Sequence, residues 1–89
     1  MSSGEFALRL LVYCGITHGS VTSWIRSPEH NAQVGGVKHS AHLYGVGADV
    51  TYDAPVPVAD ALASAARLDL RLIREGDHDH LQPMDWQAG

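Results

Sequence analysis

The run HSAHLYGVGADVTYD, residues 39–53, decides how this chain is built, because it sets a histidine and an aspartate at a fixed spacing around two glycines. His42 and Asp49 are seven positions apart, and both residue types bind zinc at neutral pH. Gly45 and Gly47 lie between them and favour a sharp turn that would let the two side chains converge. The end of the run, residues 47–53, predicts a strand.

A second cluster, REGDHDHLQP at residues 74–83, offers the third ligand that a zinc site needs. On an extended strand His78 and His80 point to the same face, so either can bind the metal. An acid precedes each histidine by three positions, Glu75 before His78 and Asp77 before His80. Such an acid is suited to take a proton from a water on the metal. Both overlapping acid-x-x-His pairs therefore remain candidates for the third zinc ligand and its general base.

The composition is that of one globular domain, residues 1–89, with 45% hydrophobic and 18% charged residues. The net charge of −4 argues against nucleic acid as a partner. Six histidines stand against six lysines plus arginines, a ratio that points to metal chemistry. Cys14 is the only cysteine, which excludes a disulfide framework and a cysteine-based zinc site.

The N-terminal apolar run, residues 6–16, is too short and too interrupted to be a transmembrane helix. Glu5 stands where the basic region of a signal peptide would lie. We therefore expect a protein that is made in the cytoplasm without a signal peptide and does not insert into membranes.

Hydrophobic periodicity predicts helices that alternate with short strands. Helices are expected over 4–14, where Gly15 would end the first, from Pro28 to the Gly35–Gly36 pair, and after Pro57. Strands are expected over 21–27, 47–53, 70–76 and 80–84. The sum is a small α+β domain, an antiparallel sheet with helices packed on one side. The alternative is an α/β arrangement with one parallel strand pair.

A longer motif surrounds the His42–Asp49 pair, and it consists of Arg26-Ser27-Pro28-Glu29, Asn31, Gly35-Gly36, Ser40, His42, Gly45, Ala48 and Asp49. In this order and spacing the chain resembles the zinc D-alanyl-D-alanine carboxypeptidase family, which includes phage L-alanyl-D-glutamate endopeptidases and has the Hedgehog/DD-peptidase fold. The resemblance is close over 21–53 and looser over 70–82. His39, Val46 and Gly47 depart from the residues usual in the family, but none of them is an expected ligand.

This resemblance implies a zinc centre. His42, Asp49 and His80 would be the three protein ligands, because His80 begins an apolar-flanked strand as the family's last ligand does. Asp77, in the acid-x-x-His position, would be the general base. His78 is the alternative third ligand.

The resemblance also implies roles around the metal. Arg26 would hold the developing oxyanion or a substrate carboxylate. Ser40 would orient substrate or a ligand, and Tyr44 would line the pocket. If His80 binds zinc, His78 would polarise the scissile carbonyl; if His78 binds zinc, Glu75 would be its base.

The activity implied is zinc-dependent hydrolysis of an amide in a peptidoglycan stem peptide, next to a D-residue. The compact single domain suggests a phage or prophage lysin that acts on the cell wall, or within a phage particle beside other virion proteins. The alternative is a virion structural or docking module that keeps the fold without catalysis. The acid beside the ligands favours the enzyme, because a docking module would not need it.

Overall fold

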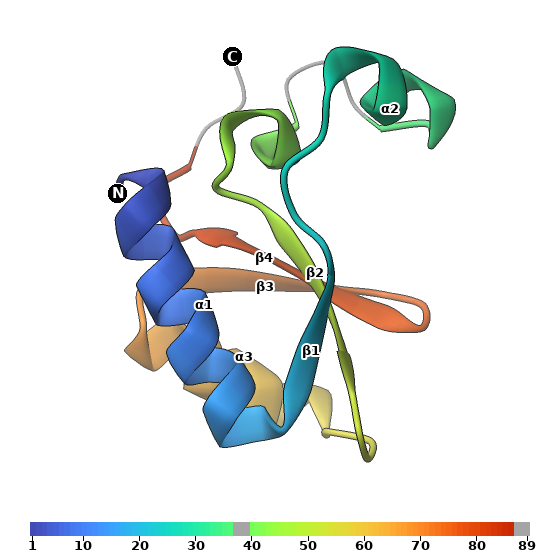
Figure 1. The fold of residues 1–89 in the computed structure, drawn as a ribbon. Coiled ribbons are helices and arrows are strands. Elements are labelled where there is room, and N and C mark those ends of the chain that lie inside the picture. The colour runs from blue at the N-terminus through green and yellow to red at the C-terminus, as the bar shows by residue number, and fades with distance from the viewer. Residues whose placement is uncertain (37–39, 87–89) are drawn as a thin grey trace.

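The protein is described by a computed structural model over residues 1–36 and 40–86, and it is an α+β domain (Figure 1). In chain order the elements are α1 (Ser3–Thr17), β1 (Gly19–Ser23), α2 (Pro28–Gln33), the 3-10 turn η1 (Ala41–Tyr44), β2 (Ala48–Tyr52), α3 (Val58–Arg67), β3 (Leu70–Glu75) and β4 (His78–Pro83). The predicted alternation of helices and strands is confirmed. Within the described ranges, every helix is too short or too polar to span a lipid bilayer.

The four strands form one sheet in the order β1-β2-β4-β3, and each described neighbouring pair is antiparallel. The alternative with a parallel pair is therefore wrong. The β3–β4 hairpin folds back so that β4 lies between β2 and β3. In that register Asp49 of β2 is paired with His80 of β4, which brings two of the expected ligands to one rung of the sheet.

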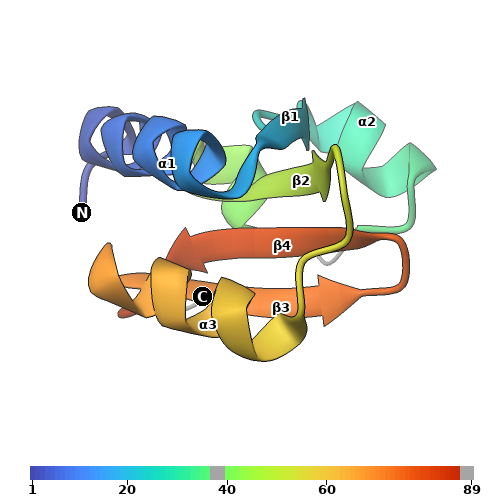
Figure 2. The same ribbon diagram turned by 90° about the horizontal axis from the view of Figure 1, so that it is seen from below.

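Helices α1 and α3 cover one face of the sheet, with α1 beside β1 and α3 beside β3 (Figures 1 and 2). The predicted stripe of α1 is confirmed, because Phe6, Leu10 and Tyr13 are all buried. The apolar core between the helices and the sheet also includes Val50, Ala61, Ala65, Leu70, Leu72 and Leu81. The opposite face of the sheet carries Asp49 of β2, Arg71 and Glu75 of β3, and His78, His80 and Gln82 of β4.

Several predicted boundaries are wrong. The first helix continues past Gly15 to Thr17, and His18 caps it in the left-handed region at φ 54°. β1 spans Gly19–Ser23 rather than 21–27, because after Ser23 the chain leaves β2 for η1, where the Arg26 backbone N–H donates to the His42 carbonyl. β4 begins at His78 rather than 80, because Glu75 pairs with His78 across a turn of only two residues.

A buried polar cluster joins four elements on the helix-covered side of the sheet. Its centre is Asp79, which is 1% exposed. Arg74 donates to the two carboxylate oxygens of Asp79 at 2.8 and 2.9 Å, and the Tyr52 hydroxyl donates to Oδ2 at 2.6 Å. Tyr13 of α1 bonds the Tyr52 hydroxyl at 2.7 Å. Burial disfavours the charged form, but the hydrogen bonds from Arg74 and Tyr52 outweigh it, so the pKa of Asp79 is lowered.

Replacing Asp79 with alanine should destabilise the fold, since it leaves Arg74 and the Tyr52 hydroxyl without their acceptor. We expect the free energy of unfolding to fall by about 2–4 kcal/mol at pH 7. A lowered carboxyl pKa stabilises the fold above the unfolded value of about 4. The gap between wild type and Asp79→Ala should therefore shrink as the pH falls through the lowered pKa. Urea denaturation at several pH values measures this difference in the free energy of unfolding. The exposed Asp85→Ala is the control. Equal stability of wild type, Asp79→Ala and Asp85→Ala would contradict the role of Asp79.

Candidate metal centre

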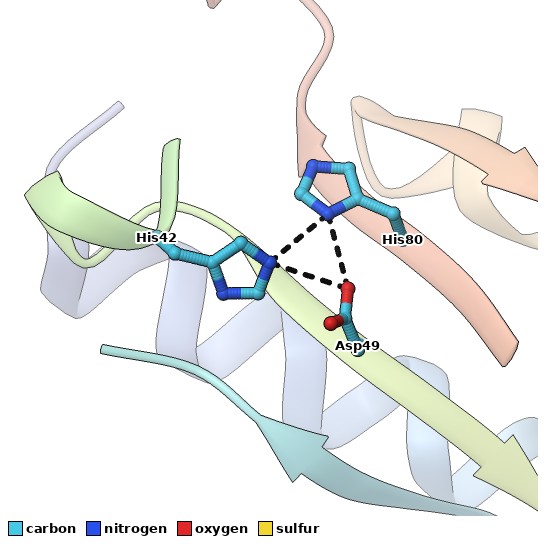
Figure 3. A group of neighbouring side chains, drawn as sticks. All are labelled: His42, Asp49 and His80. Atoms are coloured by element: carbon cyan, nitrogen blue, oxygen red, sulfur yellow. Dashed lines mark hydrogen bonds and ion pairs between the residues drawn. The ribbon is translucent and has the colours of Figure 1, made fainter. Parts of the chain in front are cut away.

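Three side chains from distant parts of the chain point at one another on the face of the sheet opposite α1 and α3 (Figure 3). His42 Nε2 lies 3.2 Å from Asp49 Oδ1 and 3.2 Å from His80 Nδ1, and His80 Nδ1 lies 3.2 Å from Asp49 Oδ1. The three side chains are 3%, 12% and 12% exposed. The three residues expected to bind zinc thus form a nearly equilateral, largely buried triangle of ligand atoms.

His42 is positioned by the short turn η1. The Ser40 hydroxyl caps this turn by accepting the His42 backbone N–H at 3.2 Å. Gly45 ends the turn in the left-handed region at φ 71°. Gly47 lies so close to η1 that a Cβ there would come within 2.8 Å of the His42 backbone nitrogen. A glycine at 47 therefore lets η1 pack on the start of β2.

The outer nitrogens of both histidines have acceptor partners, and this fixes the ring orientations. His42 Nδ1 lies 2.6 Å from the carbonyl oxygen of Trp24, and a carbonyl can only accept, so Nδ1 carries the proton. In the same way His80 Nε2 donates to Gln82 Oε1 at 2.9 Å. In the neutral tautomers, His42 Nε2 and His80 Nδ1 then direct lone pairs into the triangle. Partners of this kind are typical of histidines that bind metals.

The negative charge of the Asp49 carboxylate in this triangle needs a cation or a proton to balance it. Burial disfavours ionised Asp49, but the hydrogen bonds that His42 and His80 donate when their inner nitrogens carry a proton outweigh it and hold its pKa well below the usual range. Burial lowers the pKa of His80, and its contact with Asp49 outweighs this, so the net pKa is raised. Without a metal, a proton on His80 would therefore bridge to Asp49. A divalent cation bound here would replace that proton.

The donor set fits zinc. In a tetrahedral zinc site with ligand distances of about 2.0–2.1 Å, adjacent ligand atoms are about 3.3 Å apart. The 3.2 Å edges of the triangle agree with this spacing. Two imidazoles and one carboxylate are also a common set for a catalytic zinc, which keeps its fourth position open.

Arg26 lies against this triangle and contacts two polar neighbours. Its Nη2 donates to Asp49 Oδ2 at 3.3 Å, and its Nη1 donates to Asn31 Oδ1 at 3.2 Å. Its Nε is buried and has no hydrogen-bond partner among the described residues. Arg26 therefore orients Asp49 and keeps one donor for another acceptor.

The triangle opens into a pocket of about 580 Å³, which is lined by η1, the segment after α2, and the outward faces of β3 and β4. Glu75 and His78 lie at one end of it. Their Oε1 and Nε2 atoms are 3.5 Å apart, and together with Asp49 they form a second group whose ligand atoms all lie within 4.8 Å of one another. An acid other than Asp49 thus stands beside the candidate metal centre.

The remaining expected site residues lie at different distances from the centre. Asp77 is in the β3–β4 turn, its side chain is 97% exposed, and it contacts His78 Nδ1 at 3.0 Å without lining the pocket. Ser40 lines the pocket. Tyr44 packs on Trp86 with ring centroids 5.2 Å apart, and of these two rings only Trp86 lines the pocket. His39 falls outside the described residues.

Sequence reasoning missed two groups that hold the histidines. The Trp24 carbonyl carries no signal in the sequence, because any residue supplies a backbone oxygen. Gln82 does carry one, since it lies two positions after His80 and therefore shares its face of β4.

A comparison with protein families finds a match to the model described as Peptidase M15 over residues 17–82. The matched region contains all three members of the triangle and omits nearly all of α1. No curated protein and no solved structure matches the chain.

The triangle predicts one tight zinc site per chain. His42→Ala and His80→Ala should each weaken zinc binding at least about 100-fold, because two protein ligands hold zinc far less well than three. Zinc should also raise the melting temperature of the wild type and not of these variants. Isothermal titration calorimetry checks the affinity, with the exposed His30→Ala of α2 as control. Unchanged zinc binding in both ligand variants would show that the metal binds elsewhere.

Proposed function

Since the chain belongs to the M15 peptidase family, whose members depend on zinc, we propose that it hydrolyses an amide bond of a peptidoglycan stem peptide with zinc held by His42, Asp49 and His80. The observation that carries this proposal is the buried triangle of ligand atoms with 3.2 Å edges beside an open pocket. The substrate comes from the family resemblance of the motif at residues 21–53.

The pocket supplies the groups that amide hydrolysis requires around the metal. When bound, zinc supplies a Lewis acid and makes water a stronger nucleophile at neutral pH. Arg26 holds Asp49 through Nη2. Arg26 also lines the pocket, which supports a contact of its guanidinium with the oxygen of the scissile carbonyl, where negative charge develops in the transition state. Ser40 keeps its proposed positioning role through the His42 backbone N–H.

Two carboxylates compete to be the general base. Asp77 occupies the acid-x-x-His position that the resemblance implies, but its side chain is turned to solvent and to His78. Glu75 lines the pocket, and its carboxylate lies within 4.8 Å of a ligand atom of Asp49. The geometry therefore favours Glu75, which would take the proton from water and return it to the leaving amine. His78 bridges the two acids and would hold Glu75 in place.

Glu75→Gln and Asp77→Asn separate these two assignments. Glu75→Gln should lower kcat at least about 100-fold, because a general base contributes on the order of 10²–10⁴ to the rate. Asp77→Asn should stay within a few fold of wild type, since it acts only through His78. Steady-state kinetics on a stem peptide, with zinc content measured in each variant, tests this. The reverse ranking of the two variants would make Asp77 the base.

The function itself is tested by release of stem-peptide fragments from purified peptidoglycan. Zinc-loaded wild type should release fragments, a chelator should stop the release, and added zinc should restore it. His42→Ala should stay inactive throughout. Zinc binding without any release would favour the virion structural or docking module, in which the metal stabilises a small domain. Release would support a lysin that acts on the cell wall.

A further inference from the structure

The floor of the pocket is a ladder of three residue pairs across β3 and β4. Glu75 is paired with His78, Ile73 with His80, and Arg71 with Gln82. All six side chains line the pocket. The candidate metal centre is therefore flanked by an acidic end, described above, and by a cationic end that the proposed mechanism does not use.

Arg71 is free to bind a ligand. The other pocket arginine, Arg26, donates to Asp49 and Asn31. In the described part of the chain, Arg71 has no hydrogen bond or ion pair, although it is exposed and lines the pocket. Its neighbour Gln82 uses Oε1 to accept from His80, which leaves its amide N–H groups as further donors. A guanidinium fork beside an amide suits a carboxylate.

The wall of this end is apolar. Trp86 lines the pocket and is braced by Tyr44 through their ring contact, and its backbone N–H donates to Pro83, which pairs with Leu70 next to Arg71. Cation, amide donors and aromatic wall together suit a residue that carries a carboxylate and a small apolar part.

The spacing relates this end to the reacting bond. Neighbouring rungs on one face of a strand are about 6.8 Å apart, and an extended peptide spans about 3.5 Å per residue. Arg71 is one rung from Ile73, which pairs with His80. A carboxylate on Arg71 would thus lie within about two residues of the amide at the metal centre.

We propose that Arg71 and Gln82 form a subsite for a free carboxylate of the substrate, within two residues of the bond that is cut. This inference rests on the proposed function and deepens it. The carboxylate has two possible sources, a C-terminal carboxylate, as a carboxypeptidase needs, or the free carboxylate of an internal acidic residue, as an endopeptidase can use.

The test compares three synthetic stem peptides that end in D-alanyl-D-alanine. One has both carboxylates free, one has the C-terminus amidated, and one has the internal glutamate carboxylate amidated. For the zinc-loaded wild type, kcat/KM should fall about 10- to 100-fold for one of the amidated peptides. The amidated peptide with the lower kcat/KM identifies which carboxylate binds the subsite. Arg71→Gln should abolish this discrimination with zinc content unchanged, and Arg71→Lys should keep part of it.

The matched control is Arg67→Gln on α3, outside the pocket, which should discriminate as the wild type does. The subsite is rejected if the wild type cleaves all three peptides equally, or if Arg71→Gln keeps the full preference. If the zinc-loaded wild type cleaves none of them, the proposed function fails and the subsite with it. Cleavage without discrimination overturns the subsite alone.

Discussion

The structure depends on three ligand atoms, His42 Nε2, Asp49 Oδ1 and His80 Nδ1, which lie 3.2 Å from one another. The Trp24 carbonyl and Gln82 accept hydrogen bonds from the outer nitrogens of the two histidines, so the inner nitrogens present lone pairs beside the Asp49 carboxyl group. Such an arrangement is unfavourable unless a proton or a cation occupies it. A divalent metal would satisfy all three atoms at once, at the point where η1, β2 and β4 meet.

Strand β4 contributes side chains to the helix-covered core with one face and to the pocket with the other. Asp79 and Leu81 point to the helices, where Asp79 binds Arg74 and Tyr52. The alternate residues His78 and His80 point to the pocket. Because the two sets alternate, fixing Asp79 in the core also fixes the register that pairs His80 with Asp49. The buried cluster and the candidate metal centre are thus coupled through one backbone.

Local patterns predicted the elements well and paired His42 with Asp49, but they left His78 and His80 both possible, and the family resemblance chose His80. The limits lie where tertiary pairing overrides local preference. β1 stops at Ser23 because the chain then leaves β2 for η1, where the Arg26 backbone N–H donates to the His42 carbonyl, and this cannot be read from the residues of β1 alone. The same holds for the acids. Their spacing from the histidines favours Asp77 and Glu75 alike, and only the two-residue turn shows that Asp77 faces solvent while Glu75 lines the pocket.

The most direct test of the metal centre is the X-ray absorption spectrum of the protein loaded with one equivalent of zinc. We expect a four-coordinate shell of nitrogen and oxygen at about 2.0–2.1 Å, with the outer-shell scattering of two imidazoles. Loss of one imidazole contribution in His80→Ala would assign that ligand. A sulfur neighbour at about 2.3 Å, which only Cys14 or a methionine could supply, or a shell without imidazole, would contradict it.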